Sequence, residues 1–334
     1  RSASLPGQIT SRFQLQRMVD SGSDTVTEVP VQRWPPALPG LPSLPDPVTN
    51  RLRHGGFCDG IGLLDNLRFN ISPAEAAAMD PQQRVFLAHG YAALHWSTLD
   101  KTFLEDSVTG VFLGIQALEF PEILATTPGG GGVFATTGAA HAIACGRVSF
   151  ALGMQGPCSS SDTACSAGLV ASHAATSAVT LSECVHALAA GVNLMLLPAA
   201  SVGCAIGGMT SALGRCHTFD RRADGYCRSE ACAAFVLRRF VEDTPAATSA
   251  LCGSAGRQDG RSASITAPNG RAQQALRLDA NARAGASAGS SVVEEAHGTG
   301  TALGDPIEAG SYAAVARTLL RSRDTLGSVK ANLG

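Results

Sequence analysis

The chain has 334 residues, is 45% hydrophobic and carries a formal net charge of −2 at pH 7. This length allows a sizeable core in one or two domains, and the small net charge, without a basic run, gives nucleic-acid binding no electrostatic basis. No apolar run reaches the ~18 residues of a membrane span, and the N-terminus lacks the apolar core of a signal peptide. Ten cysteines without a CxxC pair or zinc-site spacing predict reduced thiols, no metal site, and an intracellular location, cytoplasmic or organellar.

The first third of the chain combines loop signals with two capped helices. Closely spaced prolines between residues 31 and 47 predict an extended surface segment; a proline-rich peptide ligand is the less common alternative. Ser72 and Asp80 are each followed by proline and then, three residues after the cap, by Glu or Gln. This spacing predicts a short helix that runs into a longer one. Residues 109–115, TGVFLGI, predict a buried strand.

A predicted helix over residues 138–152 leads to the stretch GPCSSSDTACSAG, residues 156–168. The small polar first half of this stretch predicts a strand. Its second half places Cys165 directly before an apolar helical run, so the thiol should lie at a tight turn. A helix start favours an anion by up to about 2 kcal/mol, and the thiolate is the nucleophilic form of cysteine. Because free cysteines are among the most buried residues, a structural role is the alternative.

Strands and helices alternate through the rest of the chain. Apolar runs predict strands over residues 183–196, 226–240, 248–255 and 292–297, and a helix over residues 271–284. This alternation indicates a layered α/β fold with largely parallel sheets.

A second segment with chemical potential, EAHGTGTALGDPIE, covers residues 295–308. Its glycines miss the spacing of a dinucleotide fingerprint by one position, which argues against nucleotide binding. Asp305 and Glu308 have the spacing of another helix capping box. His297 follows a predicted strand and precedes a glycine-rich loop, a common place for a catalytic residue, although most isolated histidines are structural. Cys165 and His297 lie so far apart in the sequence that only the fold can bring them together.

Seven blocks of the sequence, in the family's order, resemble the β-ketoacyl synthase (ketosynthase) family in its polyketide synthase branch. The blocks are VTEVPVQRW (26–34), ISPAEAAAMDPQQR (71–84), DTACSAGLVASH (162–173), GRCHTFDRRADGYCRSE (214–230), TAPNGRAQ (266–273), EAHGTGTALGDPIE (295–308) and GSVKANLG (327–334). The resemblance implies an α/β, thiolase-like fold of five layers, αβαβα, built from two similar halves. Residues 1–240 would form the half with the nucleophile, and residues 241–334 an incomplete second half with the HGTGT motif.

The resemblance also assigns roles, those of an acyltransferase of the 3-oxoacyl-acyl-carrier-protein synthase type. Cys165 would take an acyl chain from a carrier protein as a thioester. His297 would help to decarboxylate a malonyl-type thioester for a Claisen condensation, because donors in a dry pocket stabilise the enolate. The remaining assignments are Lys330 and Glu308 as paired support with Asp305 nearby, and Thr299 and Thr301 as contacts of the phosphopantetheine arm.

The same resemblance implies that no cofactor is bound permanently, since substrates arrive on the phosphopantetheine of an acyl carrier protein. It also implies a homodimer and further synthase domains in the same full-length chain. Three alternatives stay open. The first is a fatty acid synthase ketosynthase. The second is a degenerate, non-catalytic scaffold, against which the retention of Cys165 and His297 speaks. The third is a Cys–His hydrolase, for which none of the seven blocks is expected.

The sequence departs from the family at both ends. The apolar strand that opens family members is not visible, which suggests a truncation, and KANLG stops where a second catalytic His would follow. The C-terminal segment that completes the oxyanion hole is also missing, and one such donor contributes about 2.7–4 kcal/mol. We therefore expect the piece of 334 residues to condense poorly or not at all. Internal departures, which indicate a divergent branch, are Asn70, Ala167, Gly168, Ala231 and Arg257.

Overall fold

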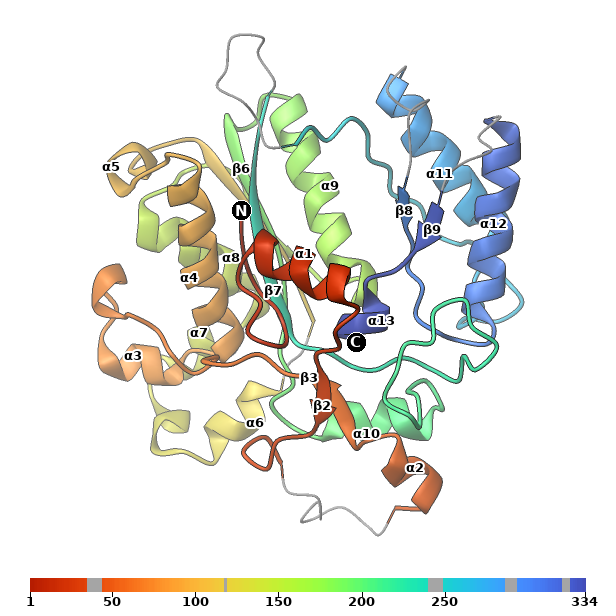
Figure 1. The fold of residues 1–334 in the computed structure, drawn as a ribbon. Helices are drawn as coiled ribbons and strands as arrows, with labels where there is room; N and C mark the ends of the chain where they lie inside the picture. Colours follow the sequence, from red (N-terminus) through yellow and green to blue (C-terminus); the bar gives the residue numbers. More distant parts are fainter. Residues whose placement is uncertain (35–43, 117–118, 240–248, 286–292, 320–324) are drawn as a thin grey trace. The chain divides into compact units, whose positions relative to one another are not determined.

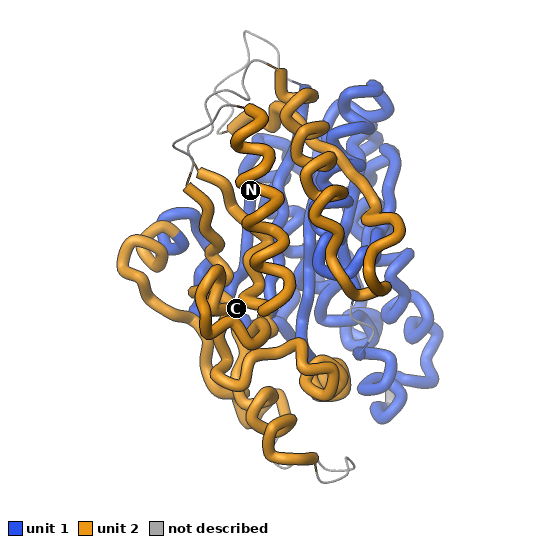
Figure 2. Tube along the Cα trace, turned by 90° about the vertical axis from the view of Figure 1, so that its right-hand side faces the viewer, with its two compact units in different colours: residues 1–15, 57–196, 230–244 blue, residues 16–56, 197–229, 245–334 orange. Residues whose placement is uncertain are grey.

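The computed structural model describes residues 1–34, 44–116, 119–239, 249–285, 293–319 and 325–334. The chain forms two compact units, and each unit draws on separate stretches of the sequence (Figure 2). The first unit comprises residues 1–15, 57–196 and 230–244, and the second comprises residues 16–56, 197–229 and 245–334. Neither unit is a continuous piece of the sequence.

A mixed five-stranded sheet lies at the centre of the first unit (Figure 1). In spatial order its strands are β1 (Ser2–Ser4), β7 (Ala231–Arg238), β6 (His186–Asn193), β4 (Thr109–Ile115) and β5 (Cys158–Ser161). Strand β4 pairs in parallel with β5 and β6, whereas β7 is antiparallel to β6 and β1. The predicted strands at 109–115, 183–196 and 226–240 are confirmed, but the expected parallel arrangement holds on only one side of β6.

Helices cover both faces of this sheet, namely α4 (Pro81–Trp96), α8 (His141–Leu152) and α9 (Ala167–Thr180). Val111 and Leu113 of β4 are buried in the core that α4 and α8 help to form. Phe112 lies between them in sequence and packs in a separate cluster with the alanines of α9. Successive residues of a strand face opposite sides of the sheet, so the uninterrupted apolar sequence of β4 follows from burial on both faces.

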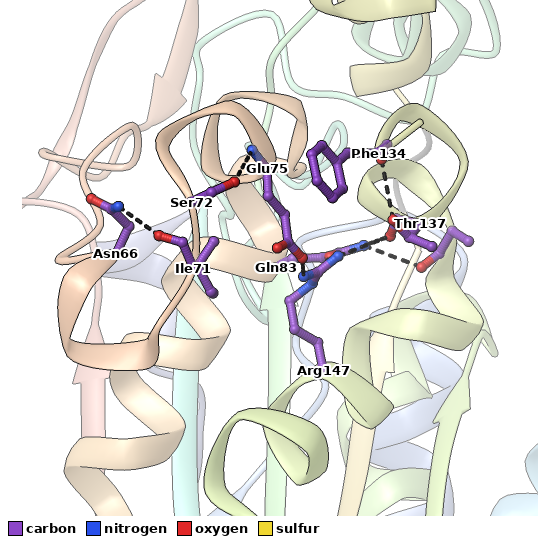
Figure 3. A network of polar contacts seen from close by, with 9 residues as sticks. Asn66, Ile71, Ser72, Glu75, Gln83, Phe134, Thr137 and Arg147 are labelled. Carbon is purple, nitrogen blue, oxygen red and sulfur yellow. Dashed lines mark hydrogen bonds and ion pairs between the residues drawn. The ribbon is translucent and has the colours of Figure 1, made fainter. Parts of the chain in front are cut away.

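The first unit also contains short helices, namely η1 (Leu67–Phe69), α3 (Pro73–Ala78), α5 (Lys101–Leu104), α6 (Phe120–Ala125), η2 (Pro128–Gly131) and α7 (Ala135–Ala139). A buried arginine joins several of them (Figure 3). Arg147 of α8 pairs with Glu75 of α3 and donates to Gln83 Oε1 of α4 at 2.8 Å. Gln83 in turn donates to the carbonyl oxygens of Thr137 and Ala140, each at 3.2 Å. The buried guanidinium is therefore paired and hydrogen-bonded, as a charge in a protein interior requires.

Both predicted helix caps in this region are confirmed. Ser72 Oγ accepts the Glu75 N–H at 3.1 Å, and Asp80 Oδ1 accepts the Gln82 N–H at 2.8 Å. Each cap satisfies a donor that the first turn of a helix would otherwise leave unpaired. The short helix α3 thus runs into the long helix α4, as expected.

Two local features of the backbone concern Ala140 and Asn70. The first corrects a predicted helix, and the second explains a departure from the family sequence. The helix predicted over residues 138–152 is divided, because Ala140 has extended backbone angles (φ −79°, ψ 127°) between α7 and α8. Asn70, where the family favours glycine, has a left-handed φ of +55°. Asparagine enters this region at a lower cost than most residues with a side chain, so the substitution preserves the turn.

The second unit contains a parallel strand–helix–strand segment. Strands β8 (Val293–Glu295) and β9 (Thr325–Gly327) pair in parallel. Helix α12 (Gly304–Thr318) lies between them in sequence and packs against α11 (Gly270–Ala284). The other elements are β2 (Val26–Glu28), α2 (Asp46–Asn50), β3 (His54–Gly56), α10 (Ala199–Ile206) and α13 (Lys330–Leu333), with α1 (Arg12–Ser21) starting in the first unit. The predicted helix at 271–284 and a strand within 292–297 are confirmed.

The strand predicted over residues 248–255 is wrong, since residues 249–255 are irregular. This segment passes so close to α11 that a Cβ on Gly253 would lie 2.6 Å from the Ala280 carbonyl oxygen. It therefore packs against the backbone of a helix and forms no ladder with a strand. No helix within the described ranges is both long and apolar enough to cross a membrane.

The chain opens with a strand, although not with the apolar strand that the family resemblance leads one to expect. The polar segment Ser2–Ser4 pairs with β7 at one end of the sheet, and Ser2 Oγ lies 2.8 Å from His89 Nδ1. An edge strand gains backbone hydrogen bonds from one neighbour and needs no apolar sequence. Of the proline-rich segment, residues 35–43 lie outside the described residues. Its end begins helix α2, which accepts Pro47 because the first turn needs no N–H from that residue.

Candidate active site

Cys165 lies in the short helix η3 (Ala164–Ser166), between β5 and α9, so the predicted order of strand, turn and helix is confirmed. Asp162 Oδ1 accepts the Ala164 N–H at 3.0 Å, and Ser166 Oγ donates to the Thr163 carbonyl oxygen at 2.9 Å. Ala164 has a left-handed φ of +53°, which costs about 1–2 kcal/mol for a residue with a Cβ. The turn therefore holds a strained residue next to Cys165, whose side chain is exposed.

Glycines let the start of α9 approach the sheet. A Cβ on Gly114 of β4 would lie 2.4 Å from the backbone carbon of Ala167. A Cβ on Gly168 would lie 3.8 Å from the Cα of Gly191 in β6. The first turn of α9 thus rests on the backbone of the sheet and fixes the turn with Cys165. Ser166, the N-cap of α9, makes no side-chain cap bond, so its side chain does not neutralise the positive end of the helix.

Burial separates Cys165 from most of the other thiols. None of the ten cysteines forms a disulfide bond, and the exposed ones are Cys158, Cys165 and Cys252. Burial raises the pKa of Cys216 and raises the pKa of Cys227 to about 12. Desolvation also raises the pKa of the Cys158 thiol. Cys165 is the exposed thiol that immediately precedes a long helix, which agrees with the sequence argument for a nucleophile.

Two carboxylates of α12 hold the loop after β8, which carries His297. Glu308 Oε1 accepts the His297 N–H at 2.7 Å, and Glu308 Oε2 accepts the Gly298 N–H at 2.9 Å. Asp305 Oδ1 accepts the Gly300 N–H at 3.1 Å and the Thr301 N–H at 3.3 Å. The expected capping box is therefore wrong. The N-cap of α12 is Leu303, without a side-chain bond, and the carboxylates bind the preceding loop.

A second stretch of the same unit, residues 216–225, also forms hydrogen bonds with this loop and with Asp305. Phe219 donates its N–H to Asp305 Oδ2 at 2.7 Å, and Thr218 Oγ1 donates to the Gly298 carbonyl oxygen at 2.6 Å. Asp305 is 4% exposed and accepts three backbone N–H groups. Hydrogen bonds to a buried charged acceptor are among the stronger ones in proteins, so the loop is firmly anchored.

The glycines of the HGTGT motif are required by conformation and by space. Gly298 and Gly300 have φ of +52° and +74°, a region that residues with a Cβ rarely enter. A Cβ on Gly298 would lie 2.6 Å from the Ser328 Cβ, and a Cβ on Gly300 would lie 2.6 Å from the His217 nitrogen. The glycines of the motif therefore allow close backbone contact with residues 217 and 328.

The other predicted residues flank this loop. Thr299 and Thr301 approach each other, with their Oγ1 atoms 3.4 Å apart, and Thr301 Oγ1 accepts the Gly304 N–H at 3.2 Å. Lys330 begins α13 directly after the turn that joins β9 to it. The structure thus gathers His297, Glu308, Asp305, Thr299 and Thr301 in one loop and helix start. Cys165 belongs to the first unit, whereas these residues and Lys330 belong to the second.

The sequence reading missed several residues that hold this site. Glu295 Oε1 accepts the Val329 N–H at 2.8 Å and the Ser328 hydroxyl at 3.1 Å, and so fixes the turn before Lys330. Its place at the start of the His297 segment was a usable signal. Arg277 of α11, which contacts Glu308, stands in a helix without any motif. In the described part of the chain, no cluster of three or more His, Cys, Asp or Glu side chains could hold a metal ion.

Two family models together match almost the whole chain. The model "Beta-ketoacyl synthase, N-terminal domain" matches residues 2–242, and "Beta-ketoacyl synthase, C-terminal domain" matches residues 248–334. Among solved structures, the ketosynthase from module 6 of the bacillaene synthase of Bacillus subtilis matches with a TM-score of 0.90 and 33% identity. An oxazolomycin ketosynthase domain from Streptomyces albus matches with a TM-score of 0.85 and 30% identity. Both matches cover 100% of this chain, and they cover 56% and 58% of the matched chains.

Similar curated proteins are large polyketide synthases. A mycocerosic acid synthase-like polyketide synthase of Mycolicibacterium smegmatis is 37% identical over 99% of this chain and 16% of its own length. Polyketide synthase GfsB of Streptomyces halstedii is 39% identical over 100% of this chain and 6% of its own length. The chain thus spans less than a quarter of the length of these relatives. Both are named as polyketide synthases, and neither name favours a hydrolase. The chain belongs to the β-ketoacyl synthase family and has the thiolase-like α/β fold of ketosynthase domains from polyketide synthases.

Proposed function

We propose that this chain catalyses the carbon–carbon bond formation of polyketide biosynthesis. The Cys165 thiolate attacks the carbonyl carbon of an acyl thioester and releases the thiol of the phosphopantetheine arm. A malonyl-type thioester then loses CO2, and its enolate carbon attacks the Cys165 thioester. The thiolate leaves, and the β-ketoacyl product remains on the carrier protein. The exposed thiol on the strained turn before α9, in a chain of this family, carries the proposal.

The residues of the second unit supply the polar part of this chemistry in the proposal. His297 donates to the oxygen on which negative charge develops during decarboxylation. Glu308 and Asp305 keep its loop in one conformation, and Lys330 supports the site from the start of α13. Thr299 and Thr301 bind the phosphopantetheine arm. The hydrogen bonds that Glu308 makes to His297 and Gly298 support this arrangement. They hold the backbone N–H groups of both residues and do not involve the imidazole of His297.

The first test is intact-protein mass spectrometry of the whole natural protein after incubation with a medium-chain acyl thioester. We expect one acyl adduct in the wild type, and none on this domain in Cys165→Ala. Cys252→Ala is a matched control, since Cys252 is also exposed but precedes no helix. An adduct that persists in Cys165→Ala would overturn the assignment of the nucleophile.

The second test separates the two halves of the reaction. We expect His297→Ala to keep acylation of Cys165 and to lose most CO2 release from a malonyl-type carrier thioester, typically by about 100-fold or more for an oxyanion donor. Equal loss of both steps would show that His297 acts on folding and not on decarboxylation.

The proposal includes the partners and the organisation of the natural protein. An acyl carrier protein delivers both substrates, no cofactor is bound permanently, and further synthase domains accompany this chain, as in the larger relatives. A second copy pairs at β5, which ends the sheet in the described part of the chain. Light scattering after gel filtration should give the mass of a dimer, and a monomer would contradict it.

An intracellular location and a division near residue 240 belong to the same proposal. The ten cysteines outside any disulfide bond support the location, and the boundaries of the family models support the division.

A further inference from the structure

Arg277 is a partly buried cation whose contacts converge on the loop of His297. Its side chain is 20% exposed and comes from the middle of α11. Arg277 Nη1 lies 2.9 Å from Glu294 Oε2 of β8, and Arg277 Nη2 lies 3.7 Å from Glu308 Oε1 of α12. The guanidinium carbon lies 5.4 Å from the centre of the Tyr312 ring. One planar group therefore joins the strand before His297 to the helix after its loop.

The oxygen that Arg277 approaches is also the oxygen that binds His297. Glu308 Oε1 accepts the His297 N–H at 2.7 Å while it faces the guanidinium. The second oxygen accepts the Gly298 N–H at 2.9 Å. The Glu308 side chain is 12% exposed, so water offers little alternative compensation for its charge. A cation beside this carboxylate holds it in the one orientation in which both of its oxygens reach the loop.

We infer that Arg277 is a positioning residue for decarboxylation, acting on the His297 backbone through Glu308. The inference rests on the proposed function. Positioning matters because a misplacement of about 1 Å can cost roughly 100-fold in rate. The planar fork of arginine can contact two carboxylates at once, whereas lysine presents a compact charge that serves fewer fixed directions. Lysine at this position should therefore rescue only part of the loss.

A merely structural role is the competing explanation, since Arg277 also joins α11 to its neighbours. Such a role would lower the amount of folded protein and reduce all partial reactions equally. A positioning role predicts a selective loss, because Cys165 lies in the first unit, whereas the contacts of Arg277 with Glu294, Glu308 and Tyr312 all lie within the second. The ratio of decarboxylation to acylation therefore separates the two explanations.

The chain offers a matched control on the same helix. Arg283 also pairs with a carboxylate, Asp279 at 4.0 Å, but it is 54% exposed and contacts no described part of the His297 loop. Replacing either arginine by glutamine removes one charge from α11 and keeps a polar side chain. Any effect that is specific to Arg277→Gln then reflects its contacts and not the charge of the helix.

The experiment compares wild type, Arg277→Gln, Arg277→Lys and Arg283→Gln in the whole natural protein. Acylation of Cys165 is followed by mass spectrometry and CO2 release from a malonyl-type carrier thioester is measured in parallel. We expect Arg277→Gln to lower CO2 release about 10- to 100-fold while acylation changes less than about twofold, with Arg277→Lys in between and Arg283→Gln unchanged. Equal loss of both reactions, or equal effects of Arg277→Gln and Arg283→Gln, would overturn the inference.

A second measurement tests the contact without relying on activity. Hydrogen exchange of a peptide that covers residues 295–303 reports the N–H groups of His297 and Gly298 directly. We expect faster exchange in Arg277→Gln than in Arg283→Gln, because Glu308 loses its orientation. Unchanged exchange would overturn the inference. A wild type that forms no Cys165 adduct would overturn the proposed function, and the exchange result would still decide whether Arg277 holds the loop.

Discussion

The two segments with candidate catalytic residues are held in place by different forces. The turn with Cys165 is fixed by shape, because Gly114 lets the backbone of α9 rest on the sheet. The loop with His297 is fixed by charge-assisted hydrogen bonds, since Glu308 and Asp305 accept backbone N–H groups. At the close backbone contact, steric repulsion prevents α9 from moving nearer to the sheet. In the loop, each backbone N–H is held by a hydrogen bond to a carboxylate, whose length and angle can change slightly. The turn with Cys165 should therefore be most sensitive to added volume, and the loop with His297 to the loss of a carboxylate.

The largest effect should come from a methyl group added at the packed contact. In Gly114→Ala the new Cβ would lie 2.4 Å from the Ala167 backbone, so α9 must move away from the sheet. We expect a loss of about 3 kcal/mol in the free energy of unfolding, together with weaker acylation of Cys165. Urea denaturation measures the first effect and mass spectrometry the second. Unchanged stability would mean that shape does not fix this turn.

In the loop with His297, Asp305→Asn should lower the free energy of unfolding by about 2 kcal/mol. The amide nitrogen of the new side chain would face a backbone N–H that now donates to a carboxylate oxygen. Denaturation of the two proteins measures the difference. Asp279→Asn in α11 is the control, because this half-buried carboxylate pairs only with partly exposed arginines in the described chain, and we expect a loss below about 1 kcal/mol there. Similar losses at both positions would contradict the special role of the loop carboxylates.

The buried thiols of the second unit, Cys216 and Cys227, predict that the free energy of unfolding depends on alkaline pH. Burial raises the pKa of Cys227 to about 12 from a reference of 9.0. As the pH rises, the unfolded chain therefore loses the Cys227 proton before the folded chain does. The free energy of unfolding is at its full value below pH ~9 and falls as the pH rises toward ~12. We expect Cys227→Ala to recover about 1.4 kcal/mol of the alkaline loss at pH 10. Melting temperatures of both proteins between pH 8 and 10.5 measure this, and parallel curves would contradict it.

The smallest effect should come from the second glycine at the packed contact. In Gly168→Ala the new Cβ would meet the Gly191 Cα at 3.8 Å, an ordinary contact distance. Alanine is better than glycine in a helix by up to about 1 kcal/mol, so we expect a small gain in the midpoint of urea denaturation. A loss of stability as large as that of Gly114→Ala would show that the whole start of α9 is tightly packed against the sheet, and not only the part that faces Gly114.

Elements with a strong local signal could be predicted from the sequence, because their causes lie within a few residues. The buried strand β4, the caps at Ser72 and Asp80, and the turn between β5 and α9 depend on local apolar patterns and on side chains that bind adjacent backbone. Most predicted site residues of the second unit could be placed in one segment for the same reason, since all of them except Lys330 fall within the block 295–308.

The errors have causes that lie far away in the chain. Asp305 and Glu308 have the spacing of a capping box, but Asp305 binds the N–H of Phe219, which no local pattern reveals. The strand β1 is polar and forms because β7 offers it an edge. Arg277 carries no motif, and its position becomes meaningful only when α11, β8 and α12 are assembled. Tertiary contacts thus decide the features that local sequence leaves ambiguous.

The interleaved course of the chain has a consequence for its synthesis on the ribosome. The Thr25 N–H donates to the Asn332 carbonyl oxygen at 3.0 Å, which joins residues from the two ends of this sequence. The second unit therefore cannot complete its folding before Asn332 has emerged from the ribosome. Such distant pairings slow folding and leave apolar surface exposed in the meantime. The nascent chain should therefore depend on chaperones for longer than a protein whose domains are continuous in sequence.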